Sequence, residues 1–353
     1  MSTQPAKAKA TSNAAVEPMT LAFDVTVTAV QELSPTFRRI TFGGYSLRDF
    51  GVAGDMLDLR VKLMIPSVDP SGRALPLPAL KLGEASWYRE WLAMDPATRG
   101  HMRTYTVRSE RLDAVYPEID IDFVMHFDDG GQGGPAANWA VAAKPGDALT
   151  IIGPNNRAAQ CSTAGAYGGI EWRPGLAQHV LLAGDETAVP AISAILESLP
   201  QQMTGHAFLE VPQAGDFRDI NTAADVEITW LARGAALGRS RPHGELLKQA
   251  VASTVPLPGW VGFTGTGAAA GPEPEDVNVD QEILWDTPQR MDAAAIEATK
   301  NPTLPAGALP FYAWLAGEAF VIKEMRRYLV RDVGIDRKQV AFMGYWRRGK
   351  AEG

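Results

Sequence analysis

Residues 103–108, Arg-Thr-Tyr-Thr-Val-Arg, form the most informative stretch of this sequence. Alternating side chains of this kind predict a short strand, and the alternation places Arg103 and Tyr105 on the same side of it. A guanidinium there can bind a pyrophosphate through two parallel hydrogen bonds, while an aromatic ring can stack on a flat heterocycle. A flavin nucleotide needs both contacts. The same residues also fit an ordinary amphipathic strand that carries two surface arginines.

Two later segments favour the phosphate-binding interpretation. Residues 119–127 predict a strand that runs into a glycine-rich turn and then a helix beginning near Pro135, and backbone N–H groups at such a helix start can bind phosphate. Residues 180–199 predict an apolar strand, a Gly-Asp-Glu-Thr turn and an amphipathic helix. This is one βα unit, and ligands of open α/β sheets bind at the carboxyl ends of the strands.

The composition narrows the classes of function. A length of 353 residues predicts two domains, and 46% hydrophobic residues suffice for two cores. A net charge of -8 argues against nucleic acid as a partner, so an anionic ligand would need a local basic pocket. No apolar run approaches the ~20 residues of a membrane span. The single cysteine, Cys161, excludes a disulfide framework and an iron-sulfur cluster, so electrons would come through another cofactor.

The N-terminal half predicts a β domain. Residues 1–18 are small and polar without an apolar signal region, so we expect a disordered tail on a cytoplasmic protein. From 19 to 172, short alternating strands are divided by turn residues, which predicts an antiparallel β-barrel. Residues 66–101 interrupt that series, and we expect a loop and a short helix there, near the mouth of the barrel.

Residues 173–353 predict a second domain of different architecture, joined through a link at 169–177. Apolar strands alternate with amphipathic helices, as in a parallel sheet covered by helices. Residues 262–310 break the alternation, and we interpret them as a flexible insertion with one helix near 292–300. The stretch 265–267, Gly-Thr-Gly, resembles a dinucleotide fingerprint, but Pro-Glu-Pro-Glu follows where a helix would be required.

Six segments occur in an order that resembles the siderophore-interacting protein family, the flavin-dependent ferric-siderophore reductases of the ferredoxin-NADP reductase-like superfamily. They are RTYTVR at 103–108, HFDDGGQGGPAANWA at 126–140, PGDALTIIGP at 145–154, GDETAVPAI at 184–192, WLAGEAF at 314–320 and GYWRRG at 344–349. The resemblance extends from about residue 20 to the C-terminus. It implies an N-terminal antiparallel β-barrel that binds FAD, followed by a parallel-sheet α/β domain of the nicotinamide-binding type.

The resemblance assigns a flavin site to the barrel and to the first βα turn of the second domain. Arg103 would bind the FAD pyrophosphate, Tyr105 would pack on the ring and Thr106 would lie near flavin N5. His126 would contact the ribityl or phosphate end, although it also fits a buried histidine at a strand end. The full set of expected cofactor contacts is Arg103, Thr104, Tyr105, Thr106, Arg108, His126, Gly134, Pro135, Ala136, Ala137, Trp139, Asp185, Thr187, Ala188 and Trp346.

Parts of that set depart from the family pattern or fit a second role. The family usually shows Gly-Pro-Ala-Ser and a basic residue before the tryptophan, whereas this sequence has Ala137 and Asn138 there. Two side-chain phosphate contacts are thereby missing, and the backbone donors remain. Asp185 and Thr187 also fit a plain helix N-cap. Trp346 could shield the flavin or pack on the last strand.

The resemblance implies that the second domain binds a nicotinamide donor. Arg233, Arg239 and Arg241 follow a predicted strand where this superfamily binds the adenosine end, and such a cluster suits a 2′-phosphate or, alternatively, a solvated turn. Gly317 and Glu318 would approach the nicotinamide through their backbone. Glu318 also fits the start of a helix.

Ferric siderophore complexes are often anionic, so their pocket needs permanent cations. Lys62 matches the family's lysine on the third strand, Arg157 follows the turn at 151–154, and Arg347 lies in the last motif. We expect these three residues to form the substrate-binding set, with solvated surface charges as the alternative.

These expectations define an enzyme in which the flavin carries the chemistry and no protein residue is catalytic or binds a metal. NADPH or NADH would reduce FAD, and electrons would pass to Fe(III) in a ferric siderophore, releasing Fe(II) because hard oxygen donors hold it less tightly. The alternatives are a flavin reductase with another acceptor and an FAD-containing siderophore carrier without turnover. The sequence leaves open the siderophore class, the oligomeric state and whether ferredoxin can replace the nicotinamide.

Overall fold

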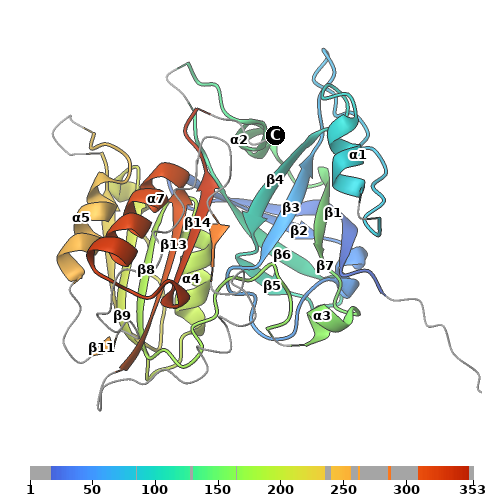
Figure 1. Cartoon of the computed structure of the whole chain (residues 1–353). Coiled ribbons are helices and arrows are strands. Elements are labelled where there is room, and N and C mark those ends of the chain that lie inside the picture. The colour runs from blue at the N-terminus through green and yellow to red at the C-terminus, as the bar shows by residue number, and fades with distance from the viewer. Residues whose placement is uncertain are drawn as a thin grey trace, which may run out of the picture.

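The computed structural model of this chain describes residues 17–84, 86–127, 130–163, 165–234, 240–255, 261–262, 285–287 and 309–349. They form two β-sheets, the N-terminal one on the right of Figure 1 and the C-terminal one on the left. Most of the predicted N-terminal tail, Arg239, the stretch 265–267 and the helix expected near 292–300 lie outside the described residues. None of the helices in the described part of the chain has both the length and the apolar character needed to cross a bilayer.

The N-terminal sheet is an antiparallel half-barrel of seven strands in the order β4-β3-β7-β1-β2-β6-β5. The strands are β1 (Thr20–Glu32), β2 (Phe37–Gly43), β3 (Arg60–Ile65), β4 (His101–Thr106), β5 (Ser109–Arg111), β6 (Glu118–Val124) and β7 (Ala148–Pro154). Alternate residues of β1 from Phe23 to Val27 are buried, which is the period of two expected when one face of a strand covers a core. The short helices α2 (Pro135–Ala142) and α3 (Ala159–Ser162) contribute to that core.

Residues 66–101 cover part of the outer face of β3 and β4. The short helix expected in this insertion is α1 (Trp87–Ala93). Trp91 is buried and packs with Met64 of β3 and Met102 of β4 in a small core of its own. Because side chains alternate along a strand, Lys62 and Thr104 lie on this same outer face.

The C-terminal sheet has five parallel strands and one antiparallel edge strand, in the order β10-β9-β8-β13-β14-β12. The strands are β8 (His179–Asp185), β9 (Thr204–Val211), β10 (Asp225–Ala232), β12 (Trp285–Asp286), β13 (Leu309–Glu318) and β14 (Val340–Trp346), and β11 (Val261–Gly262) runs parallel to the first residues of β13. Helix α4 (Val189–Ser198) packs in one core of this sheet, and α5 (Glu245–Thr254) and α7 (Ala319–Arg327) pack in the other. The predicted combination of an antiparallel barrel and a parallel α/β sheet is confirmed, and the boundary at residue 172 stays a prediction. The edge strand β12 was not predicted inside the insertion 262–310.

Short turns complete the fold. One-turn 3-10 helices cover Tyr45–Asp49, Ala214–Asp216 and Arg337–Gln339, and a π-helical turn, Tyr328–Asp332, follows α7.

Buried carboxylates hold the two sheets together. Asp216 accepts hydrogen bonds from the backbone N–H of Thr36 at 2.9 Å and from its hydroxyl at 2.8 Å, which ties the loop after β9 to the turn between β1 and β2. Asp58 accepts from the backbone N–H groups of Glu171 and Trp172 in the linking segment. Asp58 also accepts from Nε1 of Trp314 on β13 at 3.3 Å. Both carboxylates are inaccessible to solvent, so each contact fixes one sheet relative to the other.

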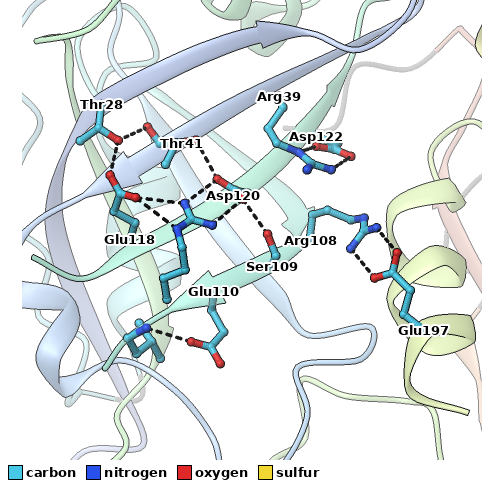
Figure 2. A network of polar contacts seen from close by, with 12 residues as sticks. Thr28, Arg39, Thr41, Arg108, Ser109, Glu110, Glu118, Asp120, Asp122 and Glu197 are labelled. Carbon is cyan, nitrogen blue, oxygen red and sulfur yellow. Dashed lines mark hydrogen bonds and ion pairs between the residues drawn. The ribbon is translucent and has the colours of Figure 1, made fainter. Parts of the chain in front are cut away.

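Figure 2 shows a third set of contacts along β2, β5 and β6. Asp120 on β6 accepts hydrogen bonds from the side chains of Thr41, Ser109 and Arg111. Burial alone would raise the pKa of Asp120, but these donors lower it to about 2. At the edge of the network, Arg108 makes two hydrogen bonds, of 2.8 and 2.5 Å, to the carboxylate of Glu197 on α4. This pair joins the half-barrel to the first helix of the parallel sheet.

Candidate functional site

Asp185 joins three strands at the carboxyl end of the parallel sheet. Its Oδ1 accepts from the backbone N–H of Thr187 at 2.9 Å and from the Thr187 hydroxyl at 2.5 Å. Its Oδ2 accepts from the backbone N–H of Glu318 and from Nε1 of Trp346, both at 2.8 Å. Burial alone would raise the pKa of Asp185, but His243 and these donors lower it. An ionised carboxylate therefore links the ends of β8, β13 and β14.

Gly317 and Glu318 form the turn from β13 into α7. Oε2 of Glu318 accepts from the backbone N–H groups of Phe320 at 2.9 Å and Val321 at 3.1 Å, so this carboxylate is the N-cap of the helix. Its Oε1 accepts from the backbone N–H of Arg348 at 3.3 Å. The helix-start interpretation of Glu318 is confirmed, and this local role explains a glutamate at the position.

Glu186 lies at the centre of a buried ion-pair cluster. Arg233, which follows β10, makes a 2.7 Å hydrogen bond to each of its two carboxylate oxygens. The same guanidinium lies 3.6 Å from Oε2 of Glu210, whose pKa is raised by burial. From the half-barrel, Nε2 of His126 lies 3.3 Å from Oε1 of Glu186. The side chain of Arg233 is 11% exposed, so this arginine is ion-paired and is not part of a solvated turn.

His243 completes the cluster from the loop between β10 and α5. Its Nε2 lies 3.4 Å from Oδ2 of Asp185 and 3.8 Å from Oε2 of Glu186. Its ring meets the Trp346 ring edge to face, with 5.2 Å between the centroids. His126 approaches the same indole from the half-barrel at 5.9 Å. Two imidazoles, one after β6 of the half-barrel and one in the loop after β10, thus flank Trp346.

Asp185, Glu186 and His243 also have the residue types of a metal site, with one ligand atom from each within 4.8 Å of the others. Both carboxylates, however, already bind other groups. Arg233 occupies both oxygens of Glu186, and four donors occupy the oxygens of Asp185. A cation would have to displace a bidentate guanidinium, so the arrangement is an ion-pair network.

One part of the set expected to bind a flavin lies on β4 and α2. The Tyr105 ring lies 4.5 Å from that of Phe123 on β6, and α2 packs against β3, β4 and β6. Helix α2 begins at the N-cap Gly134 without a side-chain cap, followed by Pro135, and a Cβ added to Gly134 would meet nothing within 4 Å. Open backbone donors at this helix start, beside the strand that carries Arg103, fit a phosphate group.

Other expected cofactor residues have structural partners. The Trp139 ring stacks on Phe42 with 6.0 Å between centroids, and the buried Ala136 lies with it in the barrel core. Ala137, Thr106 and Ala188 are buried as well, and Ala188 is the N-cap of α4. Thr104 is exposed. The expected set therefore includes residues of the barrel core, residues that border α2, residues at the carboxyl edge of the parallel sheet and, in Thr104, a residue of the outer face of the half-barrel.

The expected substrate cations lie in different surroundings. Nζ of Lys62 lies 3.3 Å from the Thr104 hydroxyl on the outer face of the half-barrel. Arg157 lies 3.5 Å from Asp49, beside α3, whereas Arg347 directly follows β14. Figure 1 shows α3 at the bottom of the half-barrel and β14 in the other sheet, so these two elements do not lie side by side. Arg241, expected at the donor site, pairs with Glu245 at 2.7 Å.

Sequence reasoning missed three residues of this edge. Glu186 was part of a quoted motif without a role, and Glu210 and His243 received none. His243 could have been found from its place, because Pro-His-Gly directly precedes a helix that follows a strand, and such loops lie at the carboxyl end of a parallel sheet.

Two family models match the chain: the siderophore-interacting FAD-binding domain over residues 26–158 and the siderophore-interacting protein over residues 177–349. The ferric vibriobactin reductase ViuB of Vibrio cholerae is 30% identical over 320 residues, covering 91% of this chain and 87% of that protein. The siderophore-interacting protein SipS from Aeromonas hydrophila is 27% identical, with a TM-score of 0.57 over 94% of this chain and 93% of that one. A siderophore utilization protein from T. fusca is 26% identical, with a TM-score of 0.59 over 95% and 96%.

The chain belongs to the siderophore-interacting protein family, and its half-barrel is the family's FAD-binding domain.

Proposed function

We propose that this protein is a ferric-siderophore reductase that holds FAD and takes electrons from NADPH or NADH. The observation that carries the proposal is the contact between the two ligand-binding ends of the fold. His126 precedes the glycine-rich turn of the FAD-binding domain, and its Nε2 lies 3.3 Å from Glu186 in the first βα turn of the parallel sheet. A flavin held by the half-barrel and a nucleotide held at the carboxyl edge would therefore be neighbours.

The half-barrel supplies the contacts for FAD. Arg103 would pair with the pyrophosphate, and the backbone N–H groups after Gly134 would hold a second part of it. Tyr105, supported from behind by Phe123, would present an aromatic face to the ring. Bound FAD would supply the redox chemistry, because it accepts electrons in pairs and releases them singly.

The carboxyl edge of the parallel sheet would bind the electron donor. Arg233 is engaged by Glu186 and Glu210, so a 2′-phosphate would have to compete with two carboxylates for it. Arg241 has a more exposed side chain and pairs with one carboxylate, so we assign the donor phosphate to it. The backbone of Gly317 and Glu318, which Asp185 fixes, would border the nicotinamide.

A ferric siderophore would approach from the side of Lys62 and Arg347. Iron is the substrate in this reaction and is not a resident cofactor. Reduction to Fe(II) weakens its bonds to hard oxygen donors, which releases it from the siderophore. Arg157 is not part of the proposed pocket, because it lies beside α3 and pairs with Asp49.

A steady-state assay tests the proposal. The purified protein would be mixed anaerobically with NADPH or NADH, a ferric siderophore and a chromogenic Fe(II) chelator, with free FAD in place of the protein as the control. We expect protein-dependent Fe(II) formation with at least one nicotinamide. No Fe(II) above the free-FAD control would reject the nicotinamide donors, and the same assay with reduced ferredoxin would then test the remaining donor.

A further inference from the structure

His243 is held in a fixed position by the loop that carries it. The backbone N–H of the next residue, Gly244, donates a 2.6 Å hydrogen bond to Oε2 of the buried Glu210. Gly244 has φ +78°, and a Cβ there would lie 2.3 Å from Cγ2 of Val321 on α7. Only glycine allows so close an approach of the loop to α7. The side chain of His243 is therefore directed into the cluster and is 6% exposed.

The surroundings of His243 are dominated by carboxylates. The titratable groups of the cluster come from every element around it: Asp185 and Glu186 after β8, Glu210 on β9, Arg233 after β10, Glu318 on β13 and His126 from the half-barrel. Neither ring nitrogen of His243 makes a hydrogen bond of normal geometry with a described residue. Its link to Asp185 and Glu186 is thus electrostatic, over 3.4 and 3.8 Å.

The protonation state of His243 follows from these distances. Burial alone would lower its pKa, but Asp185 and Glu186 raise the pKa above the ordinary histidine value. The pKa of Asp185 is lowered, which is the opposite direction and is expected for the acidic partner of an ion pair. The imidazolium and the carboxylate therefore stabilise each other around neutral pH.

We propose that His243 is a positioning residue for Trp346: its imidazolium holds the Asp185 carboxylate that accepts the indole N–H, and its ring packs against the indole at nearly a right angle. Asp185 reaches both groups through the same oxygen, Oδ2, at 3.4 Å from His243 and 2.8 Å from Trp346. The indole is thereby fixed at the junction of the two sheets, beside His126. A role of Trp346 in electron transfer rests on the proposed function. The positioning of Trp346 by His243 does not depend on that function.

A consequence distinguishes this role from simple packing. When His243 loses its proton, the attraction to Asp185 disappears while the ring remains in place. The hydrogen bond from Trp346 Nε1 to Asp185 should then change in strength. The indole N–H resonance of Trp346 should therefore shift over the same pH range in which His243 titrates. A histidine that only filled space would not produce a pH-dependent change at Trp346.

Nuclear magnetic resonance of the full-length protein tests the proposal directly. The indole resonance of Trp346 is assigned among nine tryptophans with Trp346→Phe, and that of His243 among five histidines with His243→Gln. We expect both resonances in the wild type to shift with one common midpoint, above the ordinary histidine value of about 6.5. The indole step should be lost in His243→Gln, and Asp185→Asn should lower the His243 midpoint, because it removes the largest favourable charge beside the imidazole.

His206→Gln is the matched control, because Nδ1 of His206 also lies 3.4 Å from a carboxylate, that of Glu227, away from Trp346. It should leave the indole step intact. An indole that does not titrate, or that keeps its step in His243→Gln, would overturn the proposal. If Asp185→Asn fails to fold, the two midpoints in the wild type still decide the matter.

A second measurement links the positioning to turnover. The rate of anaerobic flavin reduction at saturating NADPH should change with the same midpoint as the indole, and His243→Gln should remove that dependence. A rate with no such midpoint would limit the role of His243 to structure. Absence of flavin or of reduction would count against the proposed function alone, since the indole titration is observed without either.

Discussion

Gly317 and Asp185 approach so closely that position 317 has no room for a side chain. A Cβ atom there would lie 2.6 Å from Oδ2 of Asp185, and the backbone of Gly317 has φ +150°. The approach allows the next backbone N–H, that of Glu318, to donate to the same oxygen. The glycine of the motif WLAGEAF is therefore explained by a contact with the motif GDETAVPAI, which lies far away in the sequence.

This contact predicts a large cost for Gly317→Ala. The variant should lose about 3 kcal/mol of unfolding free energy, because backbone strain and displacement of the Asp185 carboxylate add together. Gly334→Ala is the matched control, since Gly334 also has a positive φ, of +84°, but open space around its Cβ position. It should lose about 1 kcal/mol. Equal losses in urea titrations of the two variants would contradict the close contact.

Arg103 and Lys62 should differ in their effect on flavin. Arg103→Ala removes a bidentate contact to the proposed pyrophosphate, which costs ~1.5–3 kcal/mol or about one to two decades in affinity. Lys62 lies on the outer face of the half-barrel, so Lys62→Ala should keep its flavin. The ratio of flavin to protein absorbance in the two purified variants measures the difference. Equal loss in both would mean that the assigned strand faces are wrong.

Arg108 should contribute to the junction of the sheets and not to flavin binding. Its two hydrogen bonds to Glu197 predict a coupling energy of about 0.5–1 kcal/mol in a double-mutant cycle, since the glutamate is partly exposed. Arg108→Ala and Glu197→Ala should both retain flavin. If Arg108→Ala lost flavin and Glu197→Ala did not, the arginine would be a cofactor contact after all.

Asp120 should make stability depend on pH in the acid range. The pKa of Asp120 in the folded protein, about 2, lies below the ordinary aspartate value of 3.8. The stabilisation is therefore present above the unfolded pKa and is lost as pH falls toward 2. At neutral pH, Asp120→Asn should lose on the order of 1–2 kcal/mol, because Arg111 is partly solvated. The difference from wild type should shrink between pH 4 and pH 2. The exposed Asp225→Asn is the control, and a pH-independent difference for Asp120→Asn would contradict the assignment.

The elements could be predicted from the sequence because their signals are local. β4, the turn into α2 and the β8–α4 unit each show their periodicity and turn residues within a few positions. The edge strand β12 could not, because its two residues form a strand only when β14 lies beside them. The ion-pair partners of charged residues could not be predicted either. Nothing in the sequence indicates that Arg233 faces Glu186, or that Arg157 turns toward Asp49, since each partner belongs to another strand or turn.

The candidate site shows the same division between local and distant information. The helix-start role of Glu318 could be predicted, because the N-cap depends on the residues that directly follow it. The place of His243 at this edge could also be inferred from the sequence, but its contacts could not, because Asp185, Trp346 and His243 come together only when β8, β10 and β14 are assembled. Sequence motifs thus locate the carboxyl edge, and the fold determines which charges oppose each other there.

Single-turnover reoxidation tests the central claim most directly. The protein as purified would be reduced anaerobically with NADPH until the flavin absorbance bleaches, and then mixed in a stopped-flow instrument with a ferric siderophore. We predict that the flavin absorbance returns while Fe(II) forms, with two Fe(III) consumed per flavin because FAD holds two electrons. A reduced flavin that stays bleached in the presence of bound ferric siderophore would contradict the reductase and would leave a carrier in its place.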